Sequence, residues 1–119
     1  MSATSDPACL FCRIVSGDIP STKVAEDEAV LAIRDIAPQA PTHVLVMPKR
    51  HVARTADLGE ADGELLGAVF AMLASVARDE GLEERGYRIV ANTGAWGGQS
   101  VDHVHFHLLG GRPMTWPPG

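Results

Sequence analysis

The stretch His103-Val104-His105-Phe106-His107-Leu108-Leu109-Gly110 constrains this chain more than any other segment. Histidine alternates with apolar residues along it, and a period of two is typical of a β-strand. We therefore expect the three histidines to share one face of a strand, with neighbours about 6.6–7 Å apart. Val104, Phe106 and Leu108 would point the other way, into a hydrophobic core. Such a row of imidazoles can bind a metal, hold a phosphate or attack phosphorus.

The remaining periodic segments predict an α+β fold. Leu65, Val69, Met72 and Val76 recur at helical spacing within a long helix expected over Glu60–Glu80, and Gly81 would end it. A short helix is expected over Leu10–Val15, and strands over Thr22–Glu26, Ala29–Arg34, His43–Met47, Tyr87–Asn92 and the histidine segment. Because strands and helices do not alternate regularly, the sheet is expected to be antiparallel, with five strands.

Length and composition limit the classes of protein to consider. The chain has 119 residues, the size of one domain, and is 45% hydrophobic with a formal net charge of −5. That charge argues against nucleic acid as a partner. No apolar run reaches the roughly 18–20 residues that span a bilayer, and no signal-peptide pattern precedes the domain, so we expect no membrane association and a cytoplasmic location. We expect residues 1–8 to form a flexible tail before a single domain over 9–119.

The two cysteines are spaced as Cys9-x-x-Cys12. In a reducing compartment this spacing favours a metal clip or a redox motif over a structural disulfide. A thioredoxin-like motif needs a strand before the pair, and only eight small or polar residues precede it here.

A glycine-rich loop over residues 93–100 leads directly into the histidine segment. Its Gly97-Gly98-Gln99-Ser100 offers unusual backbone angles, successive N–H groups and a hydroxyl, which together suit an anion. The spacing matches neither a P-loop nor a dinucleotide fingerprint. We expect a phosphate to lie between this loop and the imidazoles.

These motifs together resemble a known family. His103-x-His105-x-His107-Leu108-Leu109 is similar to the histidine triad signature, and the chain resembles Hint-type members of the histidine triad family of nucleotide hydrolases and transferases from Phe11 to Gly119. The segments that carry this resemblance are 35–43, 97–100 and the ending 110–119. The resemblance implies a HIT fold and a two-fold dimer that joins two five-stranded sheets into one of ten strands.

The resemblance also implies a reaction. His105 would attack the α-phosphorus of a purine nucleoside 5′-phosphoramidate or an aminoacyl-adenylate, and water would release the monophosphate from a nucleotidyl-histidine intermediate. His43 would support the triad, and Asp35, otherwise a turn-forming residue, would accept hydrogen bonds from the ribose. The phosphate and leaving group would contact Asn92, Gly98, Gln99, Ser100 and His107. The base would be walled by Leu10, Phe11, Ile14, Ile19, Ile33 and Ile36, each of which could equally be a plain core residue.

A set of two cysteines and two histidines in this chain is similar to the zinc ligands of some members of the family. Similar sets also occur in the related galactose-1-phosphate uridylyltransferases. Cys9 and Cys12 would join His51 and His103 in a Cys2His2 structural zinc site, which makes His103 a ligand rather than a catalyst. The best-known eukaryotic Hint proteins lack this Cys pair. The alternative is a pair of small buried thiols.

Two other functions stay open at this stage. One is hydrolysis of dinucleoside polyphosphates, as in another branch of the family, although the ending Trp116-Pro117-Pro118-Gly119 argues against it. The other is a nucleotide- or zinc-binding regulatory module without chemistry. The complete triad and the loop hydroxyl favour an enzyme.

Overall fold

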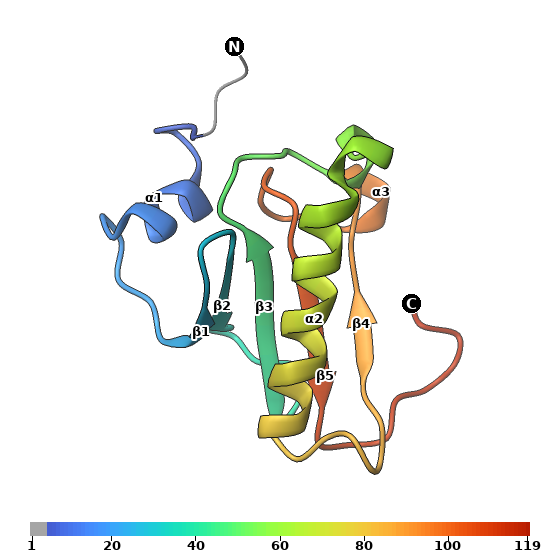
Figure 1. Cartoon of the computed structure of the whole chain (residues 1–119). Coiled ribbons are helices and arrows are strands. Elements are labelled where there is room, and N and C mark those ends of the chain that lie inside the picture. Colours follow the sequence, from blue (N-terminus) through green and yellow to red (C-terminus); the bar gives the residue numbers. More distant parts are fainter. Residues whose placement is uncertain (1–4) are drawn as a thin grey trace.

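Five strands form one antiparallel sheet at the centre of the molecule. The computed structural model describes residues 5–119. The strands are β1 (Lys23–Glu26), β2 (Val30–Arg34), β3 (Thr42–Pro48), β4 (Arg88–Val90) and β5 (Phe106–Gly110). Their order across the sheet is β1-β2-β3-β5-β4, and every neighbouring pair is antiparallel (Figure 1). The expected α+β architecture with five antiparallel strands is therefore confirmed.

Three α-helices and two 3-10 turns complete the described part of the chain. They are α1 (Leu10–Ser16), η1 (Thr55–Asp57), η2 (Glu60–Asp62), α2 (Gly63–Asp79) and α3 (Gly94–Gly97). Helix α2 begins three residues later than its apolar spacing predicts. The reason is a 3-10 turn closed by Asp62, whose Oδ2 accepts from the Gly59 N–H at 2.9 Å. The α3 turn lies inside the segment that the sequence predicts as a loop.

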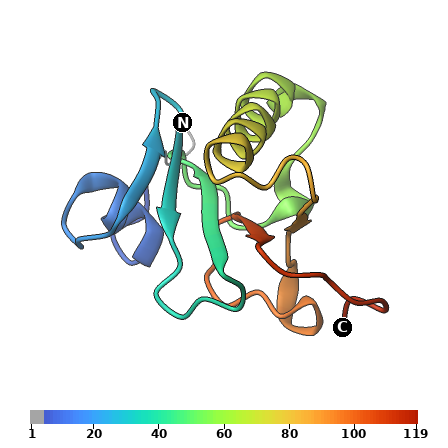
Figure 2. The same ribbon diagram turned by 90° about the horizontal axis from the view of Figure 1, so that it is seen from below.

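The two larger helices cover opposite faces of the sheet (Figure 2). On one face the apolar side of α2 packs on alternate residues of β2 and β3, such as Val30 and Val44. On the other face α1 packs on the intervening residues, such as Leu31 and Leu45. Strands β2 and β3 are therefore buried on both sides, as their continuous apolar runs predict. No helix among residues 5–119 is long and apolar enough to cross a membrane.

The regular strand in the histidine segment begins later than predicted. Val104, Phe106 and Leu108 do enter the core beneath α2, as the alternation predicts. The regular strand, however, begins at Phe106 and not at His103. The β3–β5 ladder stops near Pro48, which has no N–H and whose carbonyl instead accepts from the His103 ring at 2.7 Å. Residues 103–105 therefore continue the alternation without belonging to the ladder.

The beginning of the chain is only partly described, because residues 1–4 of the expected 1–8 tail lie outside the described residues. Within the rest of that segment, the Asp6 carbonyl accepts from the Cys9 N–H at 3.0 Å, and the Asp6 N–H donates to the Cys12 sulfur at 3.3 Å. These contacts hold residue 6 against the start of α1.

Candidate active site and metal centre

Three histidines from two neighbouring strands meet on the α1 side of the sheet. His107 lies on β5 opposite Leu45, and His43 lies two residues before Leu45 on β3, so both rings leave the same face. His105 precedes β5 by one residue. The ring centroids of His105 and His107 are 5.1 Å apart, as are those of His43 and His107. His43 and His105 are buried, and His107 is half-buried.

A backbone group fixes the protonation of the pair formed by His43 and His107. The Gln39 N–H donates to His43 Nδ1 at 3.0 Å, so the neutral ring of His43 carries its proton on Nε2. That Nε2 lies 2.8 Å from His107 Nδ1 and donates to it. His107 must then carry its own proton on Nε2. The outward nitrogen of His107 is therefore a hydrogen-bond donor.

A second backbone group determines which ring nitrogen of His105 carries the proton. Its Nδ1 lies 2.7 Å from the carbonyl oxygen of His103, which can only accept, so Nδ1 carries the proton. The Nε2 of His105 then keeps its lone pair. The edge of the Phe11 ring meets the His105 ring at a centroid distance of 4.9 Å and an angle of 88°, which holds the imidazole in place. An imidazole in this tautomer has a lone pair that can attack an electrophile.

Burial keeps these rings neutral. It lowers the pKa of His43 and of His105, although the Asp35 carboxylate opposes the shift in both. Burial, reinforced by the neighbouring His105 and His43, lowers the pKa of His107 to about 4. At neutral pH a lone pair on His105 and an N–H on His107 are therefore both available.

Asp35 lies at the edge of this cluster. Its Oδ1 accepts from the Ala37 N–H at 2.8 Å, and its Oδ2 lies 3.4 Å from His43 Nε2. Asp35, His43 and His107 are close enough to suggest a metal site. A metal would need the lone pair of His43 Nε2, and the Gln39 N–H at Nδ1 keeps the proton on that nitrogen. His43 and His107 are therefore joined by a hydrogen bond, and the Asp35 carboxylate lies beside them as a neighbouring negative charge.

The residues expected to wall a base fall into two groups. Phe11, Ile14 and Ile33 are buried in the apolar cluster beneath α1, with Ile19 packed against it. Ile36, next to Asp35, is fully exposed at 101%, and Leu10 is exposed on α1. The structure brings the first group together and leaves the second on the surface.

The glycine-rich loop is braced by Gln99. The Gln99 Oε1 accepts from the Gly94 N–H at 3.0 Å, and its Nε2 donates to the carbonyls of Ala53 at 2.7 Å and Val101 at 2.9 Å. The side chain of Gln99 thereby holds the loop in shape. Ser100, which follows it, is exposed, and Gly98 has a φ of 80° that favours glycine.

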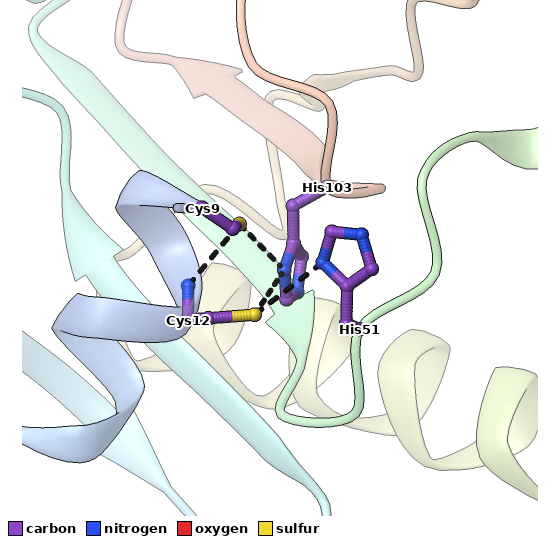
Figure 3. Close-up of side chains that lie close together, drawn as sticks. All are labelled: Cys9, Cys12, His51 and His103. Atoms are coloured by element: carbon purple, nitrogen blue, oxygen red, sulfur yellow. Dashed lines mark hydrogen bonds between the residues drawn. The ribbon is translucent and has the colours of Figure 1, made fainter. Parts of the chain in front are cut away.

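A second group of four side chains, Cys9, Cys12, His51 and His103, gathers around one point (Figure 3). His103 Nδ1 lies 3.4 Å from Cys9 Sγ and 3.6 Å from Cys12 Sγ, while His51 Nδ1 lies 3.3 Å from Cys12 Sγ. Sulfur and nitrogen ligands of a tetrahedral zinc ion are about 3.6 Å apart. The His103 Nε2–H donates to the Pro48 carbonyl, so the lone pair on Nδ1 faces the sulfurs. Donor types, spacing and tautomer all fit a metal ion.

The chain around the cluster also suits thiolate ligands. The Cys12 N–H donates to Cys9 Sγ and the Asp6 N–H to Cys12 Sγ, both at 3.3 Å. Burial raises the pKa of the Cys9 thiol, a cost that a bound cation would offset. Both cysteines are free thiols, and each faces a histidine. This arrangement favours the metal clip over the redox motif.

The groups that sequence reasoning missed belong to the backbone. The N–H of Gln39 and the carbonyl of His103 set the tautomers of the active-site rings. Gln39 is itself held by Arg112, whose Nη2 and Nε donate to its carbonyl at 3.0 and 3.3 Å. Every residue has such backbone groups, so no residue type could have indicated these two.

Comparison with known proteins agrees with this geometry. The family model described as the HIT domain matches residues 16–114. The chain is 53% identical to the "14 kDa zinc-binding protein" of Zea mays, over 96% of this chain and 90% of that one. It is 49% identical to "Adenylylsulfatase HINT1" of Arabidopsis thaliana, over 97% and 79% of the two chains.

A solved structure extends the likeness to three dimensions. The HIT family hydrolase of Legionella pneumophila superimposes with a TM-score of 0.92 at 55% identity, covering 93% of this chain and 99% of that one. A histidine triad protein of Clostridium difficile gives a TM-score of 0.90 at 38% identity, with coverages of 93% and 96%. With the triad geometry, these matches show that the chain belongs to the histidine triad (HIT) family and is of the Hint type.

Proposed function

We propose that this protein cleaves purine nucleoside 5′-phosphoramidates or aminoacyl-adenylates at the α-phosphorus. His105 Nε2 forms a bond to phosphorus while the bond to the leaving group breaks, and the leaving group takes a proton from solvent. Water then attacks phosphorus, the bond to Nε2 breaks, and the nucleoside monophosphate departs. The observation that carries the proposal is the His105 Nδ1–H bond to the His103 carbonyl, which leaves a lone pair on Nε2.

The substrate phosphate would lie between the imidazoles and the glycine-rich loop. The outward Nε2–H of His107 would donate to a phosphate oxygen, and Ser100, Gly98 and Asn92 would line the other side. His43 acts on His107 from behind, as the 2.8 Å bond between them indicates. Because the side chain of Gln99 is engaged in the loop, its part in binding would be to hold the loop around the phosphate.

The nucleoside would lie against α1 and the loop after β2. Asp35 would accept from the ribose hydroxyls. The base would contact the apolar residues Phe11, Ile14, Ile19, Ile33 and Ile36. The full exposure of Ile36 beside that carboxylate supports this placement, because a bound base would cover it.

We also propose that Cys9, Cys12, His51 and His103 hold a structural Zn²⁺. Four protein ligands leave no open position for a substrate, so the zinc would stabilise the fold and take no part in the reaction. The site would join the start of α1 to the histidine segment. The name of the maize relative, a zinc-binding protein, supports zinc as the metal.

We further propose a two-fold dimer that extends the sheet through β4. This strand lies at an edge of the sheet, with unpaired backbone groups available to a second copy. Ile89 on β4, Tyr87 just before it and Phe70 on α2 are exposed, and burying them would stabilise such a pair. Light scattering should give a mass of two chains, and a mass of one would contradict the proposal.

One variant tests the reaction. His105→Ala should abolish release of adenosine monophosphate from adenosine phosphoramidate, because the nucleophile is lost, yet should still bind adenosine monophosphate by calorimetry. Ser16→Ala, a change on the exposed end of α1, serves as a matched control with unchanged turnover. Normal turnover in the His105 variant would refute the mechanism, and no turnover in the unaltered protein would favour a binding module.

Side-by-side assays separate the candidate substrates. Diadenosine polyphosphates test the alternative branch of the family, and faster cleavage of these than of the phosphoramidate would favour it. Adenylyl sulfate is a third substrate to compare, because the name of the Arabidopsis relative is an adenylylsulfatase. All three share the α-phosphorus that His105 would attack, so the leaving group alone distinguishes them.

A further inference from the structure

Two adjoining cavities lie where the loop between α2 and β4 meets the segment after β5, at the end of the sheet away from α3 (Figure 1). Their volumes are about 270 and 290 Å³. Arg85, Gly86, Arg112 and Pro113 line both of them, so they form one continuous groove. Arg88 lines the second cavity. We call this feature the arginine groove.

Glycines let the walls of the groove come together. A Cβ on Gly110 would lie 2.6 Å from Leu82 Cδ1, and a Cβ on Gly111 would lie 2.7 Å from Pro41 Cβ. Gly86 has a φ of 99°, which other residues rarely adopt. The end of β5 is therefore pressed against the loop that carries Arg85. The groove is a fixed feature of the packing.

Within residues 5–119, the arginines that line the groove form no ion pair. The chain has ten lysines and arginines, and Lys23, Arg34, Lys49 and Arg50 each lie within 4.0 Å of a carboxylate. The other six basic residues form no such pair within the described part of the chain, and three of them, Arg85, Arg88 and Arg112, line this groove. Such clustering stands out in a chain with a net charge of −5.

Two of the three arginines are held in place without being neutralised. Arg88 Nη2 donates to the Thr115 carbonyl at 2.8 Å, and Arg112 donates to the carbonyls of Gln39 and Pro113. Carbonyl oxygens orient a guanidinium but carry no formal charge. Glu83 and Glu84 lie on the same loop, yet they are exposed and do not line either cavity.

We propose that the arginine groove binds a phosphate group, either inorganic phosphate or the phosphomonoester of a small molecule. Guanidinium groups match tetrahedral oxyanions by paired, charge-assisted hydrogen bonds. Each cavity is slightly smaller than an ordinary small-molecule site, which suits a group as small as a phosphate. The groove shares no lining residue with the histidine cluster, but it adjoins the function proposed above in two places. Arg112 also holds the carbonyl of Gln39, and Tyr87 and Arg88 lie at the sheet edge proposed for the dimer. Arg85 has neither of these roles.

Nuclear magnetic resonance on the full chain tests the proposal. Inorganic phosphate, and separately ribose 5-phosphate, is titrated at constant ionic strength while backbone amide shifts are followed. The amides of Gly86 and Arg112 should shift along a saturating curve, with its own midpoint distinct from that of Ser100. Tighter binding of ribose 5-phosphate assigns an ester ligand, and tighter binding of phosphate assigns the free ion; either result supports the site.

Matched variants make the test specific. Arg85→Gln should weaken phosphate binding at the groove about tenfold, because a charged hydrogen-bond donor is lost, and leave the Ser100 curve unchanged. Arg85 is exposed, so the fold should survive the change. Arg78→Gln removes the same charge from the exposed side of α2 and should leave the affinity within about twofold. Shifts that never saturate, or equal affinities in the two variants, would overturn the proposal.

Discussion

The low pKa of His107 predicts that acid destabilises this protein through one identifiable residue. The pKa of a histidine in an unfolded chain is about 6.5, and that of His107 in the folded protein is about 4. At a pH between these values, His107 is protonated in the unfolded chain and neutral in the folded protein. The free energy of unfolding therefore falls as the pH drops from about 6.5 towards 4. The stabilisation is fully present above the unfolded pKa.

The size of the effect follows from the two pKa values. Between pH 7 and pH 5, His107 alone should lower the free energy of unfolding by about 2 kcal/mol. His107→Asn removes the titration. The Asn side-chain oxygen can still accept from His43 Nε2, which now donates to His107 Nδ1 at 2.8 Å. Between pH 7 and pH 5, the free energy of unfolding of the variant should therefore fall by about 2 kcal/mol less than that of the unaltered protein.

Urea denaturation at pH 7, 6 and 5 measures this difference. Ionic strength and metal content are matched in every sample. A shared dependence on pH cancels in the comparison. Two curves that stay parallel within about 0.5 kcal/mol would show that His107 does not carry the acid sensitivity, and the reasoning from burial would fail.

Three further predictions concern the metal centre and two glycines. Protein purified without chelators should contain one zinc per chain by elemental analysis. Cys12→Ser should lose this zinc and, at a metal concentration a hundred times the dissociation constant, about 3 kcal/mol of the free energy of unfolding. A full complement of zinc in the variant would show that Cys12 is not a ligand. Gly110→Ala should destabilise by about 1–3 kcal/mol, because its Cβ would lie 2.6 Å from Leu82 Cδ1. Gly67→Ala, on the exposed side of α2 with open space around it, should stabilise by about 0.5–1 kcal/mol in the same denaturation assay.

Side-chain periodicity predicted the parts of this fold that depend on burial. The faces of Val104, Phe106 and Leu108 followed from alternation, because successive side chains of an extended segment point to opposite faces and only one face here enters the core beneath α2. The burial of both faces of β3 followed from its continuous apolar run. The pairing of Cys9 and Cys12 with His51 and His103 was expected by resemblance, and the distances among their ligand atoms now agree with it.

The parts that could not be predicted depend on backbone groups or on distant segments meeting. The start of β5 is set by Pro48, which lies more than fifty residues earlier in the chain. Gln99 suggested a phosphate contact by its type, but its side chain makes three hydrogen bonds within and beside its loop. The arginine groove forms only where Arg85 and Arg112 meet across the end of the sheet. Local patterns carry no information of this kind.

The pairing of β5 with β3 has a consequence for changes in chain length. Deleting one residue within the alternating stretch 104–106 would turn its neighbours to the opposite face, placing an imidazole under α2 or Phe106 among the histidines. Inserting two residues would keep the faces but move each ring by about 6.6–7 Å, away from the acceptor that sets its tautomer. The alternating stretch 104–108 can therefore accept some substitutions, but an insertion or deletion there would disturb both the core and the row of histidines.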